Sequence, residues 1–183
     1  MEWNFSLEIY NSFGQFSCYI DFMVVIGVDL GTATTGYGIL SLDSGKISVL
    51  TYGSILTDKL TDFPKRLGYI FGEIKNLIKI WKVDELALEK VFFEKNTKTA
   101  LSVSQSQGVV TLSAVTSKIP VFEYTPLQVK IAVTGYGKAG KPQVGKMVKS
   151  LLKLKDVPKP DDVADALAVA VCHAYSRKIR RVL

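Results

Sequence analysis

The sequence predicts a mixed α/β fold, in which a five-stranded sheet has three antiparallel strands, then parallel strands, and helices on both faces. Three short apolar runs separated by turn residues come before any helical pattern, which is typical of an antiparallel meander. Helical and strand patterns then alternate, which is typical of a sheet covered on both faces. With 183 residues and 48% apolar content, the chain is long enough for one main domain and too short for two.

The strands are predicted from apolar runs bounded by turn residues. The first run is short and continuous and ends before glycines, as expected of a central strand buried on both faces. A turn signal, "DSG" at 43–45, separates the second strand from the third. The fourth strand runs out into a polar loop, "EKNTK". The predicted strands are 24–29, 37–40, 47–55, 85–93 and 121–124.

Helices are predicted where apolar residues recur at spacings of three and four. The clearest helix covers 62–81, with Asp62 as its N-cap and Pro64 in its first turn. The last helix covers 162–177, and its final turn is basic, as the helix dipole favours. A basic segment, "TGYGKAGKP", is predicted to be flexible. The other predicted helices are 97–117, 127–133 and 143–154.

The charge is distributed unevenly along the chain. Glu2, Glu8 and Asp21 give the first 22 residues a charge of −3, which leaves +9 on the remainder of a chain whose net charge is +6. Lys and Arg side chains that neutralise phosphates release counterions, and this release supplies much of non-specific nucleic-acid affinity. The basic domain therefore favours a polyanionic partner, and the alternative is a merely solubilising surface.

Residues 1–22 are predicted to lie outside the folded domain. They are rich in aromatic side chains and lack the basic and continuous apolar regions of a secretory signal. The simplest explanation is that Met23 is the true start, and the alternative is a genuine extension that packs on the domain. We expect an N-terminal extension over 1–22, a folded domain over 23–177 and a basic tail over 178–183.

The cysteine count and the apolar runs narrow the class of protein. Cys18 and Cys172 are far apart and lack metal-ligand spacing, so we expect neither a disulfide framework nor a zinc site, and a reduced, cytoplasmic setting. No apolar run approaches the roughly 18 residues that a membrane span needs, so no membrane partner is expected. In the last helix, Cys172 is interpreted as a core residue and His173 as a packed or surface residue without a catalytic role.

Four acidic residues are placed where their side chains could meet. Asp29 ends the first strand, Glu89 lies at the C-terminal end of another central strand, and Asp162 and Asp165 share one face of the last helix's first turn. Gathered carboxylates repel one another unless cations compensate them, and hard oxygen ligands select Mg²⁺ or Mn²⁺. Two such ions would suit in-line phosphodiester hydrolysis. Taken singly, these acids could instead be a turn former, an exposed strand-end charge and helix-capping residues.

Several segments in order resemble one family over essentially all of residues 23–177. These segments are "IGVDLGTATTGYGIL", "LALEKVFFEKNTKTALSVSQSQGVV", "VFEYTPLQVKIAVTGYGKAGKPQV" and "PDDVADALAVAVCHA". Together they resemble the RuvC family of bacterial Holliday-junction resolvases. The resemblance implies a ribonuclease-H-like fold, a homodimer, and Mg²⁺-dependent symmetric nicking of four-way junction DNA during recombination and repair. It also implies a partnership with the branch-migration proteins RuvA and RuvB.

The same resemblance assigns roles to individual side chains. It makes Asp29, Glu89, Asp162 and Asp165 the metal-binding acids, with Asp161 as the neighbouring alternative to Asp162. Lys130 and Lys141 match positions near the scissile phosphate, where a cation can offset developing charge. Phe92 matches an aromatic side chain that stacks on an unpaired base, and Phe93 is interpreted as a core residue. The remaining DNA-binding assignments are Lys95, Lys138 and Lys146. For each lysine, a solvated surface position is the alternative.

One departure from the family pattern leaves other functions open. Leu30 stands where the family usually has proline, and "VVIGVDLGTATTG" is also similar to the phosphate-binding turn of Hsp70- and actin-type ATPases. Those ATPases bind nucleotide between two such domains, and this chain has no second such motif. The second hypothesis is a branched-DNA-binding module without activity, and the ATPase is the third. The glycines after Asp29 are expected to form turns that let phosphate and metal approach the backbone.

Overall fold

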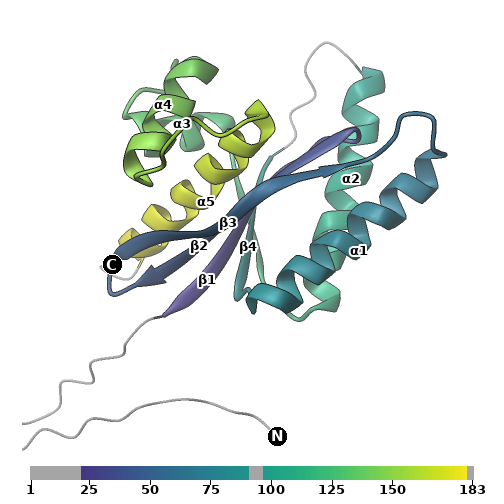
Figure 1. Ribbon diagram of the computed structural model, residues 1–183, viewed down its shortest axis with the longest axis horizontal. Coiled ribbons are helices and arrows are strands. Elements are labelled where there is room, and N and C mark those ends of the chain that lie inside the picture. Colours follow the sequence, from purple (N-terminus) through teal and green to yellow (C-terminus); the bar gives the residue numbers. More distant parts are fainter. Residues whose placement is uncertain (1–21, 91–96, 181–183) are drawn as a thin grey trace, which may run out of the picture.

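A computed structural model describes residues 22–90 and 97–180, and within them five strands form one mixed sheet (Figure 1). The strand order is β3-β2-β1-β4-β5. The pairs β3–β2 and β2–β1 are antiparallel, whereas β1–β4 and β4–β5 are parallel. The predicted fold class is therefore confirmed. The strands are β1 (Met23–Asp29), β2 (Thr34–Asp43), β3 (Lys46–Leu56), β4 (Glu85–Glu89) and β5 (Val121–Tyr124).

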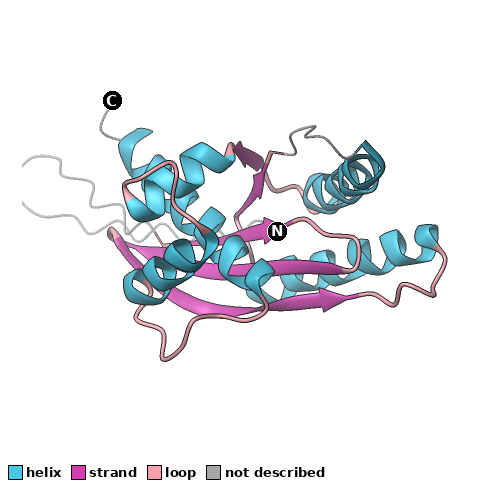
Figure 2. Cartoon of the chain, turned by 90° about the horizontal axis from the view of Figure 1, so that it is seen from above, coloured by secondary structure: helices cyan, strands magenta, loops and turns pink. Residues whose placement is uncertain are grey.

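Helices cover both faces of the sheet. One face carries α1 and α2, and the other carries α5, on which α3 and α4 pack (Figure 1). Seen from above, the long strands of the meander run side by side among the helices (Figure 2). The helices are α1 (Phe63–Trp81), α2 (Thr97–Thr116), α3 (Pro126–Thr134), α4 (Lys141–Leu151) and α5 (Asp161–Arg180). No helix in the described ranges is long and apolar enough to cross a membrane.

The alternation of side chains along β1 divides the core into two parts. Val24, Ile26 and Val28 are buried against α1 and α2, whereas Val25 is buried on the α5 side. A strand whose neighbouring side chains point to opposite faces must be apolar at every position when both faces are covered. This explains the continuous apolar run in the sequence, and it means that Asp29 points toward α5.

The predicted boundaries differ most in the β2–β3 hairpin. The ladder extends from the Thr34–Leu56 pair to the Asp43–Lys46 pair, with one shift of register between Ile39 and Leu40, so β2 is much longer than the predicted 37–40. Polar residues within a long hairpin obscure the strand pattern but still pair through the backbone. The predicted turn is confirmed, because Ser44 and Gly45 both adopt positive φ angles, 48° and 83°.

Two smaller predictions need correction. Asp62 occupies the N-cap position of α1, but its side chain makes no capping hydrogen bond and instead lies 3.1 Å from the Lys65 ammonium. The segment between α3 and α4 is an ordered turn. The Tyr136 N–H donates to the Thr134 hydroxyl, the Ala139 N–H donates to the Tyr136 carbonyl, and α4 begins at Lys141.

Candidate metal and nucleic-acid site

Two of the predicted acids lie on neighbouring parallel strands at the same edge of the sheet. The last paired residues of β1 and β4 are Val28 and Leu88, and Asp29 and Glu89 each follow directly. Because side chains alternate along a strand, both acids point to the face that α5 covers. The register of two parallel strands thus brings together carboxylates that are far apart in the chain.

The other two acids, Asp162 and Asp165, lie at the start of α5, and this part of the helix packs very closely against the sheet. A Cβ on Gly27 would lie 2.3 Å from the Ala166 carbonyl oxygen, one on Gly36 would lie 2.0 Å from the Asp162 carbonyl oxygen, and one on Gly38 would lie 2.5 Å from the Leu167 side chain. The helix therefore rests on strand positions that have no side chain. Gly36 is also the β2 partner of Asp29.

These contacts correct the interpretation of the glycines after Asp29. Gly36 and Gly38 lie inside β2 and provide space for α5, rather than forming turns that expose the backbone to phosphate. Gly31 alone lies in the turn after β1, where an added Cβ would meet the Thr34 carbonyl oxygen at 2.0 Å.

Asp29 is the most perturbed member of this group. Burial raises the pKa of its carboxyl from 3.8 to about 7, and the negative charges of Asp165, Asp162 and Glu89 contribute to this rise in that order, while Lys141 lowers it. Each named charge must be near Asp29 to act on it through a partly dry environment. All four predicted acids therefore share one electrostatic environment.

Glu89 responds to the same surroundings. Burial raises the pKa of its carboxyl, the charge of Asp165 adds to this effect, and Lys130 and Lys141 oppose it. Lys130 on α3 and Lys141 at the start of α4, which were predicted to lie near the scissile phosphate, are thus close enough to act on Glu89.

Lys141 makes a direct ion pair within the group. Its ammonium donates to Asp165 Oδ2 at 2.7 Å, and the two side chains are 65% and 22% exposed. Lys138 and Lys146, which were predicted to bind DNA backbone, lie on the turn before α4 and on α4 itself.

The structure distinguishes Asp162 from its neighbour. Asp162 is half-buried and raises the pKa of Asp29, whereas Asp161 is exposed as the first residue of α5. Asp162, and not Asp161, therefore belongs to the group of four acids.

The donor set suits a hard divalent cation. Burial is the largest cause of the raised pKa of Asp29, and the charges of Asp165, Asp162 and Glu89 add to it, so these four carboxylates lie close enough to interact. Oxygen donors of this kind are typical of Mg²⁺ and Mn²⁺ sites. Among the described residues, no three acidic, histidine or cysteine side chains form a ready metal cage, and Lys141 holds one oxygen of Asp165.

A positioning contact beside Asp29 was missed by the sequence prediction. The Arg66 guanidinium, on α1, donates to the Thr32 carbonyl and to the Thr57 hydroxyl, and this hydroxyl also donates to the Thr32 carbonyl. The turn that follows Asp29 is therefore tied to two other elements. Only the three-dimensional fold reveals this contact, because the arginine lies 34 residues from Thr32.

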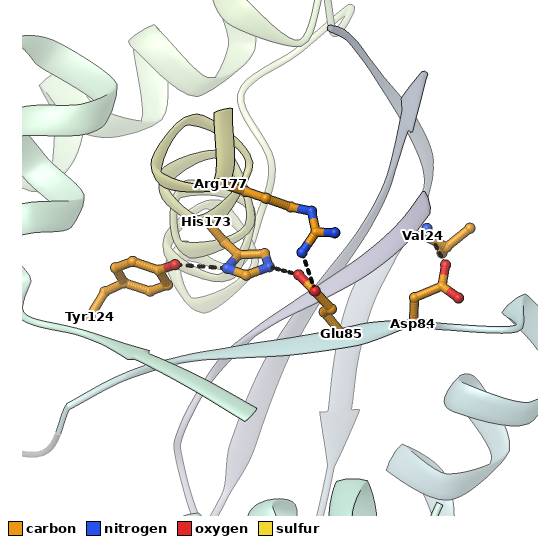
Figure 3. Close-up of polar contacts among 6 residues, drawn as sticks. All are labelled: Val24, Asp84, Glu85, Tyr124, His173 and Arg177. Atoms are coloured by element: carbon orange, nitrogen blue, oxygen red, sulfur yellow. Dashed lines mark hydrogen bonds and ion pairs between the residues drawn. The ribbon is translucent and has the colours of Figure 1, made fainter. Parts of the chain in front are cut away.

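A buried polar network fixes α5 further along its length (Figure 3). The Tyr124 hydroxyl lies 2.7 Å from His173 Nδ1, and His173 Nε2 lies 2.6 Å from Glu85 Oε2. Arg177 donates to the other oxygen of Glu85. His173 and Cys172 are buried, so of the two positions left open for His173 the packed one is confirmed. The only sequence signal for this network was that Glu85 directly precedes an apolar run and that His173 is a single polar residue within another.

Three predicted residues have no described structure. Phe92, Phe93 and Lys95 lie outside the described residues. Their proposed roles in base stacking, core packing and DNA binding stay predictions.

Comparisons with known proteins agree with this architecture. The family model described as crossover junction endodeoxyribonuclease RuvC matches residues 25–173. The crossover junction endodeoxyribonuclease RuvC of Pelotomaculum thermopropionicum is 52% identical over 153 residues, which cover 84% of this chain and 93% of that protein. The protein of the same name from Syntrophomonas wolfei is 48% identical over 161 residues, which cover 88% and 94%.

Solved structures give the same result. The Thermus thermophilus RuvC structure superposes with a TM-score of 0.79 at 32% identity, covering 86% of this chain and 97% of that one. A second T. thermophilus RuvC structure, in complex with a Holliday junction substrate, gives a TM-score of 0.77 at 30% identity and covers 86% and 96%.

Proposed function

Because this chain belongs to the RuvC family of crossover junction endodeoxyribonucleases, we propose that it cuts four-way DNA junctions at the edge of the sheet where its four acids meet. The observation that carries this proposal is the environment of Asp29. Burial and three other carboxylates together raise the pKa of this carboxyl to about 7. Such a concentration of negative charge is costly to the fold and useful for holding cations.

Nucleases of this family use divalent metal ions, and we propose Mg²⁺, with Mn²⁺ as a substitute and two ions in each site. Asp29, Glu89, Asp162 and Asp165 would hold them. When bound, the ions would supply an activated water and stabilise the leaving 3′ oxygen.

The lysines of the site would act on the DNA strand. Lys130 lowers the pKa of the Glu89 carboxyl, so the Lys130 ammonium lies close to Glu89. There it would offset negative charge that develops on the scissile phosphate. Lys138 and Lys146 would bind the backbone on either side and strengthen binding without altering the rate of the chemical step.

A homodimer is part of the proposal. One site makes one cut, and two symmetric cuts across a two-fold junction need two subunits. Support comes from α2, which leaves Leu101, Leu112 and Val115 more than half exposed. Apolar side chains gathered on one helix suit an interface between two copies. The RuvA and RuvB partnership and the cytoplasmic location are proposals that rest on the family alone.

The test compares a synthetic four-way junction with linear duplex DNA of the same sequence, with and without Mg²⁺. We expect symmetric cuts in the junction alone, and only with the metal. Asp29→Asn should abolish cutting while junction binding survives, because it removes charge from the site and leaves the basic surface intact.

A matched pair of variants tests the α5 assignment. Asp162→Asn should reduce cutting strongly, whereas Asp161→Asn, the exposed neighbour, should cut at close to the wild-type rate. Junction binding without any cutting by the wild-type protein would support a non-catalytic DNA-binding module instead. A rise in Tm with saturating ATP would support the ATPase hypothesis.

A further inference from the structure

Lys141 occupies an unexpected place for a residue that is proposed to act on DNA. Its ammonium is bound to Asp165 Oδ2 at 2.7 Å. The hydrogen bond to Asp165 is the largest influence that raises the pKa of Lys141, and the charges of Asp29 and Asp162 add to it. The lysine is thus a cation held among the carboxylates.

The ion pair between Lys141 and Asp165 opposes the proposed role of Asp165 as a metal ligand. The ammonium occupies Asp165 Oδ2 at 2.7 Å, so a divalent ion bound to the same carboxylate would lie close to the positive charge of Lys141, and the two cations would repel each other. The two cations therefore compete for one carboxylate.

The Lys141 side chain can readily leave Asp165. Its side chain is 65% exposed, so its ammonium can return to water without a buried charge being created. A lysine is a compact charge on a flexible four-carbon stem, and it can swing while its backbone stays fixed as the first residue of α4. A divalent ion brings twice the charge to the same carboxylates and should win the competition at saturation.

We propose that Lys141 is an exchangeable counter-ion, which pairs with Asp165 in the metal-free protein and is displaced toward the DNA strand when a divalent ion binds. This inference rests on the proposed function, since it needs Asp165 to be a metal ligand. It adds an order of events to that function. Lys141 becomes available to the phosphate only in a metal-loaded site. Without metal, its ammonium stays paired with Asp165 and does not contact the DNA strand.

The first test measures Ca²⁺ binding by calorimetry without DNA, so that cutting plays no part. Lys141→Gln removes the competing cation and should bind Ca²⁺ about ten-fold more tightly than the wild-type protein. Lys141→Arg keeps the charge and should bind close to the wild-type affinity. Lys79→Gln, an exposed lysine on α1 across the sheet, makes the same change in net charge and should leave the affinity unchanged.

The second test observes the lysine directly. In protein labelled with ¹⁵N-lysine, the Lys141 ammonium signal, assigned by its loss in Lys141→Arg, should be visible in the metal-free state. It should shift or broaden beyond detection as Ca²⁺ saturates the site. A Lys141 signal that saturating Ca²⁺ leaves unchanged would overturn the exchange.

The results separate this inference from the function on which it rests. If Ca²⁺ binds the wild-type protein and Asp29→Asn abolishes that binding, while Lys141→Gln binds with wild-type affinity, the exchange is refuted and the metal site stands. If Ca²⁺ does not bind the wild-type protein, or Asp29→Asn binds it equally well, the proposed metal site fails and the exchange fails with it.

Discussion

Gly36→Ala is the sharpest test of how the fold builds the site. The added Cβ would lie 2.0 Å from the Asp162 carbonyl oxygen and 2.4 Å from the Asp162 carbonyl carbon, and both atoms belong to backbone. Ordinary van der Waals contact begins at 3.4 Å, so β2 and the first turn of α5 must separate by about 1.4 Å. Backbone in a regular helix cannot make room by a rotamer change, so the turn itself must move.

That movement displaces Asp162 and Asp165 relative to Asp29, which is the strand partner of Gly36. A misplacement of about 1 Å in a catalytic arrangement costs about 100-fold in rate. Overpacking also destabilises the fold by about 1–3 kcal/mol, and each kcal/mol lowers the Tm by about 2–4 °C in a domain of this size. We expect Gly36→Ala to cut junction DNA about 100-fold more slowly in single-turnover assays at a temperature where it remains folded.

Gly72→Ala provides the matched control. Gly72 lies within α1, and a Cβ there would meet no atom within 4 Å. Alanine in place of glycine inside a helix should stabilise the protein by about 1 kcal/mol and leave cutting unchanged. If Gly36→Ala cuts as fast as Gly72→Ala and melts at the wild-type temperature, the close approach of α5 does not control the site.

Three further outcomes are expected. The pKa of Asp29 is about 7 in the folded state and 3.8 in the unfolded state. Between these pH values the folded protein binds more protons than the unfolded chain, so the free energy of unfolding falls as pH rises through this window. Metal-free Asp29→Asn should therefore gain more Tm over the wild-type protein at pH 8 than at pH 5, and equal gains at both pH values would refute this cause. Tyr124→Phe removes the hydroxyl that lies 2.7 Å from the buried His173 ring and should cost about 1–3 kcal/mol in urea unfolding, whereas an unchanged value would show that this contact does not stabilise the fold. Phe92→Ala should slow junction cutting more than it weakens junction binding, since stacking on a base is worth about 1–3 kcal/mol, and equal losses in both would indicate a packing role.

The sheet was predictable because its pattern is local. The strand β1 is a continuous apolar run and the helix α1 has a clear period of three to four residues, and both were located to within a residue. The acids at the strand ends followed from the same local pattern, since parallel strands end at a common edge. The resemblance to the RuvC family, and not the strand pattern, was what grouped Asp29 and Glu89 with the aspartates of the last helix as metal ligands.

The contacts between distant elements were not predictable in the same way. The glycines after Asp29 were expected to form turns, because a glycine in a sequence signals backbone freedom more readily than close packing by a distant helix. The register of α5 on β2, the Arg66 contact to the turn after Asp29 and the ion pair of Lys141 all join residues that are far apart in the chain. Such contacts depend on how elements pack, which periodicity does not encode.

The position of α5 explains how the protein tolerates a concentrated negative charge. Residues 166–174 of this helix are almost wholly buried, so the helix is packed on all sides. It therefore cannot shift to relieve the repulsion between the carboxylates at its first turn and those on the strands. The contacts of His173 and Arg177 with Glu85 fix the helix further along the same axis. The positive end of the helix dipole lies where Asp162 and Asp165 stand and offsets part of their charge. The remaining charge stays uncompensated in the metal-free protein. A fold that holds the carboxylates this rigidly leaves cation binding as the main way to relieve their repulsion, and the Lys141 ammonium already does so in part.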